Sequence, residues 1–157
     1  MQPVSPFPTR KDPAAEALRT PPHSLEAEQA VLGGLLLDNS AWDRIGDVVA
    51  ESDFYRQDHR QILRAIVRQI AENHPADAVT VSESLQSLGQ LESVGGLAYI
   101  VALASNTPSA ANIRRYAEIV RERSVMRRLA EVATGIADTA YAPAGRSASQ
   151  LLDEAEA

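Results

Sequence analysis

The sequence predicts an all-α fold, in which a globular helical head is followed by a projecting antiparallel helical hairpin and the start of a linker helix. Apolar side chains recur at three- and four-residue spacing in successive segments, which is the period of one helix face. Serine, threonine, asparagine or aspartate precedes most of these segments, where its side chain can cap a helix N-terminus. The 157 residues are 45% apolar, which is enough for one domain core.

Composition narrows the classes of function. The chain has no cysteine, so neither a disulfide framework nor a thiolate metal site can form. The net charge of −6 argues against nucleic acid as the main partner, because neutralising phosphates needs a concentrated positive surface. No apolar run approaches the roughly 20 residues that cross a bilayer, and the N-terminus lacks the apolar region of a signal peptide. We therefore expect a cytoplasmic protein that does not contact a membrane.

Residues 1–22 hold six of the nine prolines and almost no periodic apolar residues. This composition is typical of a disordered tail. A short binding peptide is the alternative, since Pro3, Pro6 and Pro8 surround Phe7.

The predicted head covers residues 23–92 and begins with a helix that Ser24 can cap. Gly33 and Gly34 lie inside this helix and would weaken it by roughly 1 kcal/mol each relative to alanine. We therefore expect another backbone to pack closely against the helix at this point.

Two further capping signals lie in the head. The turn sequence DNS at residues 38–40 predicts the start of a second helix, in which Trp42 is a core anchor. Thr80 and Glu83 have the spacing of a capping box for a short helix that Gly89 ends.

A helix over residues 57–72 carries a stripe of arginines at four-residue spacing. The arginines are Arg56, Arg60, Arg64 and Arg68. The stripe could hold phosphate or an acidic partner, and a helix-turn-helix protein could use it to contact DNA. A solvated face that Asp58 and Glu72 partly neutralise is the simpler interpretation.

The hairpin is predicted over residues 93–142. Residues 93–104 are the most apolar stretch, and a short connection through Pro108 joins them to a long helix over residues 108–141. A connection this short predicts two antiparallel helices, and the Gly95-Gly96 pair is expected to allow them to pack closely. Thirty-odd helical residues reach about 50 Å, beyond the ~40 Å of a compact domain of this size, so the long helix should project and need a partner.

Residues 143–157 are predicted to start a linker. Pro143 and Gly145 end the long helix, and Ser147 with Gln150 has the spacing of a capping box for a last helix. The sequence stops inside that helix without a C-cap, so we expect the chain to be a piece of a longer protein.

The sequence contains no constellation that supports catalysis. A GxxxxGK[ST] loop is missing, and three scattered histidines without cysteine give no nucleophile and base pair. We expect no catalytic residue, no cofactor and no metal in this chain.

Several long motifs resemble the N-terminal domain of the DnaB family of bacterial replicative DNA helicases. The motifs are PPHSLEAEQAVLGGLLLDN, GQLESVGGLAYIVALASNTPSAANI, YAEIVRERSVMRRL and GRSASQLLDEAEA. The resemblance covers residues 23–157 and implies a collar in which hairpins pair into dimers and three dimers form a hexamer. It also implies docking of the helicase-binding domain of DnaG primase, and an ATPase domain, with its ATP and magnesium, beyond residue 157. A helicase loader or a phage protein is a further possible partner.

The candidate site residues are interfacial. For pairing of hairpins we expect contacts from Leu97, Ile100, Val101, Ile113, Tyr116 and Val120, with a place in the intramolecular core as the alternative for each. For coupling to primase, the family's placement of that surface points to Arg127, Arg128, Glu131, Ile136 and Leu151. Local ion pairs within the long helix are the alternative for the charged members of this set.

Two other functions remain open. A stand-alone helical adaptor with no enzymatic parent would also be acidic and free of catalytic residues. A DNA-binding protein that uses the Arg60, Arg64 and Arg68 stripe is opposed by the net acidity.

Overall fold

The computed structural model describes residues 20–157. The predicted disordered tail, including the segment around Phe7, lies outside the described residues except for residues 20–22. The helices are α2 (Leu25–Leu37), α3 (Trp42–Ile45), α4 (Gln57–Ala71), α5 (Ala78–Ser87), α6 (Gly96–Ser105), α7 (Ile113–Tyr141) and α8 (Ala148–Glu156). Three short 3₁₀ turns join them: η1 (Asn39–Ala41), η2 (Glu51–Asp53) and η3 (Glu92–Val94). No strand occurs in residues 20–157, so the all-α prediction is confirmed.

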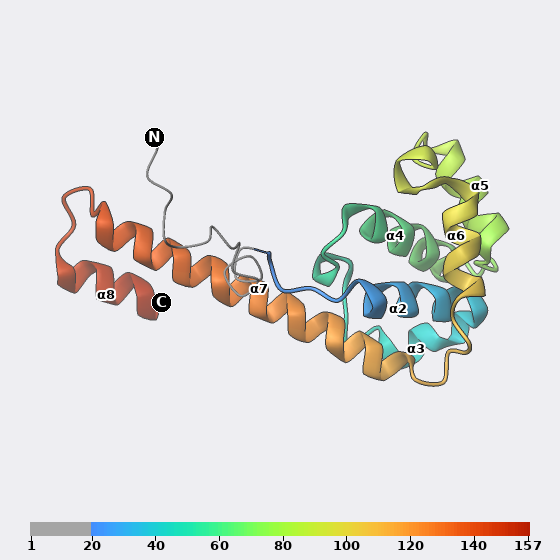
Figure 1. The fold of residues 1–157 in the computed structure, drawn as a ribbon, viewed down its shortest axis with the longest axis horizontal. Coiled ribbons are helices and arrows are strands. Elements are labelled where there is room, and N and C mark those ends of the chain that lie inside the picture. Colours follow the sequence, from blue (N-terminus) through green and yellow to red (C-terminus); the bar gives the residue numbers. More distant parts are fainter. Residues whose placement is uncertain (1–19) are drawn as a thin grey trace, which may run out of the picture.

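Helix α2 lies at the centre of the head, where α4, α6 and α7 pack around it (Figure 1). The predicted cap is confirmed, because the Ser24 side chain accepts a hydrogen bond from the Ala27 amide. Val31, Leu32 and Leu35 are completely buried, so α2 contributes side chains to the centre of the hydrophobic core of the head.

The two glycines of α2 permit the close approach that the sequence predicts. A Cβ atom at Gly33 would lie 2.0 Å from Thr107 Oγ1 and 2.3 Å from the Leu103 carbonyl oxygen. At Gly34 it would lie 3.0 Å from Ile113 Cδ1. The segment joining α6 and α7 can cross α2 at this distance only because position 33 lacks a side chain.

The second predicted helix is shorter than expected. Asp38 caps the turn as predicted, since its carboxylate accepts from the Ser40 amide, but the turn continues as η1 and the four-residue α3. Trp42 is only partly buried and packs against the core from its edge, so it anchors the core less than predicted. Phe54 takes that place, because its side chain is completely buried.

Helix α4 begins at the predicted residue, whereas α5 begins earlier than predicted. The capping box of α5 joins Asp77 and Thr80 rather than Thr80 and Glu83. Gly89 follows the end of α5 with a φ of 69°, as the predicted stop requires.

The apolar stretch 93–104 does not form one arm of a hairpin with the long helix. Helix α6 packs against α2 and α5 and therefore belongs to the head. Gly95 and Gly96 have φ values of 104° and 74°, so they form the turn between η3 and α6 rather than a helix contact. Periodicity identified a buried helix here but could not identify its neighbours.

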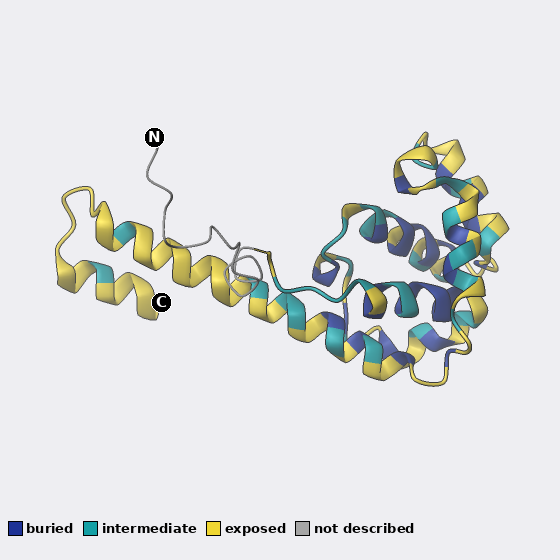
Figure 2. Ribbon diagram, viewed as in Figure 1, coloured by how far each residue is buried: buried dark blue, intermediate teal, exposed yellow. Residues whose placement is uncertain are grey.

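Helix α7 starts five residues later than predicted. The Thr107 hydroxyl donates to the Leu103 carbonyl at 2.9 Å and so continues the end of α6 instead of capping α7, whose N-cap is Asn112. The helix spans ~43 Å, and its distal part is exposed along most of its length (Figure 2).

The antiparallel partner of α7 is α8. Helix α7 ends at Tyr141, before the predicted breakers Pro143 and Gly145, and the chain turns back. The Ser147–Gln150 capping box is confirmed, and α8 then runs alongside the distal end of α7 (Figure 1).

Candidate functional site

An apolar groove lies between α7 and α8. It has a volume of about 570 Å³, and its apolar walls come from Val132, Ile136, Leu151 and Leu152. Two residues predicted to couple to primase, Ile136 and Leu151, therefore line one groove. Ile136 is 43% exposed and Leu152 is 65% exposed, so these side chains present apolar surface to solvent.

The apolar surface continues along α7 from this groove toward the head. Large exposed apolar side chains on this stretch are Val125, Met126, Leu129 and Val132. Arg128 and Glu131 are also exposed and flank the row. Large exposed apolar patches are typical of surfaces at which proteins bind one another.

The six residues predicted to pair hairpins fall into three groups by burial: core, exposed and half-buried. Ile100, Ile113 and Val120 are buried to 1% exposure or less, because they pack between α6, α7 and the rest of the head. Their assignment to an interface is therefore corrected: they are core residues of a single chain. Leu97 and Val101 are 48% and 42% exposed on α6 and remain candidates for a contact with another chain.

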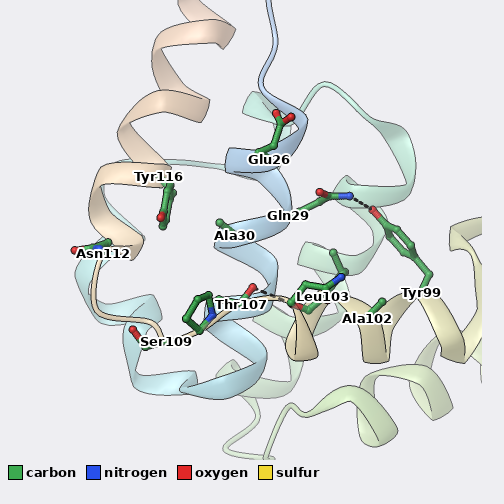
Figure 3. A pocket seen from close by; sticks show the side chains of 12 residues that line it. Glu26, Gln29, Ala30, Tyr99, Ala102, Leu103, Thr107, Ser109, Asn112 and Tyr116 are labelled. Carbon is green, nitrogen blue, oxygen red and sulfur yellow. Dashed lines mark hydrogen bonds between the residues drawn. The ribbon is translucent and has the colours of Figure 1, made fainter.

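Tyr116, the remaining residue predicted to pair hairpins, is half-buried and lines a pocket beside α2 (Figure 3). The pocket has a volume of about 380 Å³ and lies between α2, α6 and the start of α7. Ala30 and Leu103 contribute apolar surface, whereas Glu26 and Asn112 contribute polar groups. The pocket has the size and mixed character of a site for a small side chain or ligand.

A buried polar cluster connects three helices of the head, and sequence reasoning missed it. The Glu28 carboxylate on α2 is 2% exposed and lies 2.9 Å from His59 Nδ1 on α4. It also accepts from the Tyr55 amide at 3.0 Å. His59 Nε2 lies 2.6 Å from the hydroxyl of Tyr99 on α6, and Gln29 donates to the same hydroxyl at 3.2 Å. In the sequence, Glu28 is explained by its place in the first turn of a helix, where a carboxylate favours the helix dipole. Only the tertiary contacts therefore identify the cluster.

Arg127 does not lie on a free surface of α7. Its guanidinium donates to the Pro22 carbonyl at 2.8 Å and to the Asp53 carbonyl at 2.7 Å, and it lies 5.4 Å from the ring centroid of Tyr55. Of the predicted coupling residues, it is therefore the one that binds the head.

The arginine stripe on α4 is engaged in contacts within the chain. Arg60 donates to the backbone carbonyls of Phe54 at 2.7 Å and Tyr55 at 3.0 Å. The other three pair with nearby acids: Arg56 with Asp58, Arg64 with Glu51, and Arg68 with Glu72. The hydrogen bonds that Arg56 donates to Asp58 raise the pKa of Arg56, and those that Arg64 donates to Glu51 raise the pKa of Arg64. The solvated, neutralised face is thus the interpretation that the structure favours.

Within residues 20–157, no three histidine, aspartate or glutamate side chains gather as a metal site would require. No helix in this part of the chain is long and apolar enough to cross a membrane.

Comparison with known proteins identifies the family. Residues 20–122 match the family described as the DnaB-like helicase N terminal domain. The chain is 46% identical over 136 residues to the replicative DNA helicase DnaB of Haemophilus influenzae, and 44% identical over 145 residues to that of Buchnera aphidicola subsp. Baizongia pistaciae. These matches cover 87% and 92% of this chain, but only 29% and 31% of the relatives. The chain thus spans about a third of the length of the curated relatives.

Solved structures agree. The N-terminal domain of DnaB helicase from Mycobacterium tuberculosis superposes with a TM-score of 0.81 at 40% identity, over 87% of this chain and 96% of that chain. The corresponding domain from Helicobacter pylori shares the fold, with a TM-score of 0.63 at 24% identity over 73% of this chain and 89% of that one. Because the family match covers more than half of the chain, the chain belongs to the family of DnaB-like helicase N-terminal domains.

Proposed function

We propose that this chain is the N-terminal collar domain of a replicative DNA helicase, which assembles its parent protein and docks DnaG primase. The parent is an ATP-dependent DNA helicase, and its ATP and magnesium belong to a motor domain outside this chain. The support is that the curated relatives are replicative DNA helicases and that this chain corresponds to about 30% of their length. The collar works in the cytoplasm, at the replication fork.

The observation that carries the proposal is the apolar surface of distal α7 and α8. The exposed side chains extend from Val125 to Leu152, and the head covers none of the groove between the two helices. Covering an exposed apolar row with a second helix removes apolar surface from water and so stabilises the associated state. A second copy of the chain supplies such a helix, and three dimers of this kind complete a hexameric collar.

Primase is the second partner in the proposal. The structures of the H. pylori domain and of a DnaB-like replicative helicase are described together with their interactions with primase. In this chain, Arg128, Glu131 and Ile136 are exposed on α7, and Leu151 on α8 is half-buried in the groove beside them. Together they offer both charged and apolar contacts. A loader or phage protein would compete for the same surface.

The proposed mechanism is mechanical. A hexameric collar holds several primase molecules near the strand that leaves the motor, which raises the local concentration of primase at that strand. Direct binding of nucleic acid is not part of the proposal, because the α4 arginines are paired with acids or bound to carbonyls.

Light-scattering mass on a sizing column tests the proposal. The chain is run alone and with the helicase-binding domain of the cognate primase. We expect a dimer or larger species that becomes heavier when the primase domain is added. A monomer that does not bind the primase domain contradicts both parts of the proposal and favours a stand-alone adaptor.

A further inference from the structure

The attachment of α7 to the head changes character along the helix. Its buried residues are Ile113, Ala117 and Val120, which all lie in its first third. Beyond them, Arg121 and Arg127 reach back to the head through hydrogen bonds. Every residue from 128 to 138 is exposed. Along α7, the hydrogen bonds of these two arginines are therefore the last ones to the head before the exposed part of the helix.

Arg127 joins three segments of the chain. Its Nη1 donates to the carbonyl of Pro22, which precedes α2, and its Nη2 donates to the carbonyl of Asp53 in η2. The guanidinium lies over the Tyr55 ring, 5.4 Å from its centroid, and the His23 ring stacks on Tyr55 with the two ring centroids 4.3 Å apart. A planar guanidinium holds two acceptors in fixed directions, which a lysine ammonium does not.

Arg121 also binds Asp53, but at the carboxylate of its side chain instead of its backbone carbonyl. Its Nη1 donates to Asp53 Oδ1 at 2.9 Å, while Asp53 Oδ2 accepts from the Ala50 amide at 2.7 Å. Asp53 is only 3% exposed, and the Ala50 amide holds the second oxygen of its carboxylate. Residue 53 thus receives one arginine on its carboxylate and the other on its carbonyl.

We propose that Arg121 and Arg127 are positioning residues that set the direction in which distal α7 leaves the head. Val120 is the last buried apolar residue of α7 and is taken as the pivot. Arg127 lies ~10 Å beyond it along the helix axis and Tyr141 ~30 Å beyond it. A shift of 1 Å at Arg127 therefore moves the far end of the helix by about 3 Å. The consequence for assembly rests on the proposed function, because the surfaces assigned to partners lie on this distal part.

The chain has no cysteine, so two introduced cysteines can carry spin labels without background. Gln57→Cys places one label on the head and Thr134→Cys places the other on distal α7, and both positions are exposed. Labelled chain is diluted with unlabelled chain, so that only distances within one chain are measured. In Arg127→Ala we expect the distribution of distances to broaden or shift by about 3 Å or more. The Arg121→Ala, Arg127→Ala double variant should broaden it further.

Arg128→Ala is the matched control, since it removes the same charge from the next, exposed position. Its distance distribution should match that of the parent. Arg127→Lys separates loss of the two hydrogen bonds from a folding defect, because lysine keeps the positive charge and the aliphatic stem. We expect its distance distribution to be broader than that of the parent, since an ammonium group cannot hold both carbonyls in fixed directions. Parent-like distances in Arg127→Lys and in the double variant overturn the proposal, as does equal broadening in Arg128→Ala.

The distance measurement needs no partner, so it separates this proposal from the proposed function. Broadened distances in a chain that never assembles support the positioning role and contradict the collar. Unchanged distances in a chain that assembles and binds the primase domain overturn the positioning role and leave the collar intact.

Discussion

Gly33 and Thr107 meet so closely that a single methyl group would separate α2 from the α6–α7 connection. A Cβ atom at Gly33 would lie 2.0 Å from Thr107 Oγ1, while that hydroxyl already donates to the Leu103 carbonyl 2.9 Å away. The same carbonyl would lie 2.3 Å from the new atom. Because one of the two obstacles is backbone, side-chain rotation alone cannot relieve the overlap.

Gly33→Ala should therefore lower the free energy of unfolding by about 2–3 kcal/mol, as overpacking of a core does. The measurement is urea unfolding followed by far-UV circular dichroism. Gly135→Ala is the control, because nothing lies within 4 Å of a Cβ at that exposed helical position. It should not lower stability, since alanine favours a helix over glycine by about 1 kcal/mol. Equal behaviour of the two variants would mean that α2 and residue 107 are not in contact.

Glu28 supports the head through three hydrogen-bond donors. The carboxylate accepts hydrogen bonds from the Tyr55 amide at 3.0 Å, the Arg56 amide at 3.4 Å and His59 Nδ1 at 2.9 Å. Glu28→Ala leaves His59 Nδ1 and two backbone amides without their acceptor. Because each unsatisfied buried donor costs roughly 1–3 kcal/mol, we expect a loss of about 3–5 kcal/mol in the free energy of unfolding. Thermal or urea unfolding measures the loss.

Glu26→Ala is the matched control for that prediction, because it removes a carboxylate from the same turn of α2 at an exposed position. Its effect should stay below about 1 kcal/mol, which is the range of a helix-dipole interaction. A small loss in Glu28→Ala would show that the head does not depend on the buried pair.

Arg60 and Arg64 differ in what they bind, although the sequence places them on one stripe. Arg60 donates to two backbone carbonyls, whereas Arg64 pairs with Glu51 at the surface. Arg60→Ala should lower the free energy of unfolding by about 1–2 kcal/mol, since hydrogen bonds from a charged donor to partly buried carbonyls are lost. Arg64→Ala should leave the urea midpoint unchanged, because exposed ion pairs contribute little. A lower midpoint for Arg64→Ala than for Arg60→Ala would contradict this ranking.

The sequence predicted helix faces and helix ends more reliably than helix neighbours. The caps at Ser24 and Ser147 and the stop at Gly89 are confirmed, because each depends on residues within one turn. The start of α7 was misplaced because Thr107 uses its hydroxyl on the preceding helix, which local spacing cannot reveal. The partner of α6 was wrong for a related reason: an apolar face shows that a helix is buried, but not against what.

The candidate site residues likewise divide into those that the sequence could predict and those that depend on tertiary contacts. Exposure of Ile136 beside Leu151 follows from apolar residues near the end of a projecting helix, and sequence reasoning could reach it. The contact of Arg127 with Pro22 joins residues 105 positions apart, and an arginine on a polar face gives no sign of it. Ile100 and Val120 were assigned to an interface because periodicity does not distinguish an intramolecular face from an intermolecular one.

Ile136 offers the sharpest test of the groove between α7 and α8. The side chain is 43% exposed, lines the groove and makes no contribution to the buried core of the head. Ile136→Asp should therefore leave the unfolding of the head unchanged. If a partner helix covers the groove, the buried carboxylate costs more than ~1.4 kcal/mol, so assembly or primase binding should weaken at least about tenfold. Ala137→Asp adds the same charge at an exposed neighbour outside the groove and should have a much smaller effect. Light-scattering mass across a concentration series measures both variants, and equal weakening would mean that charge on α7, rather than the groove, controls association.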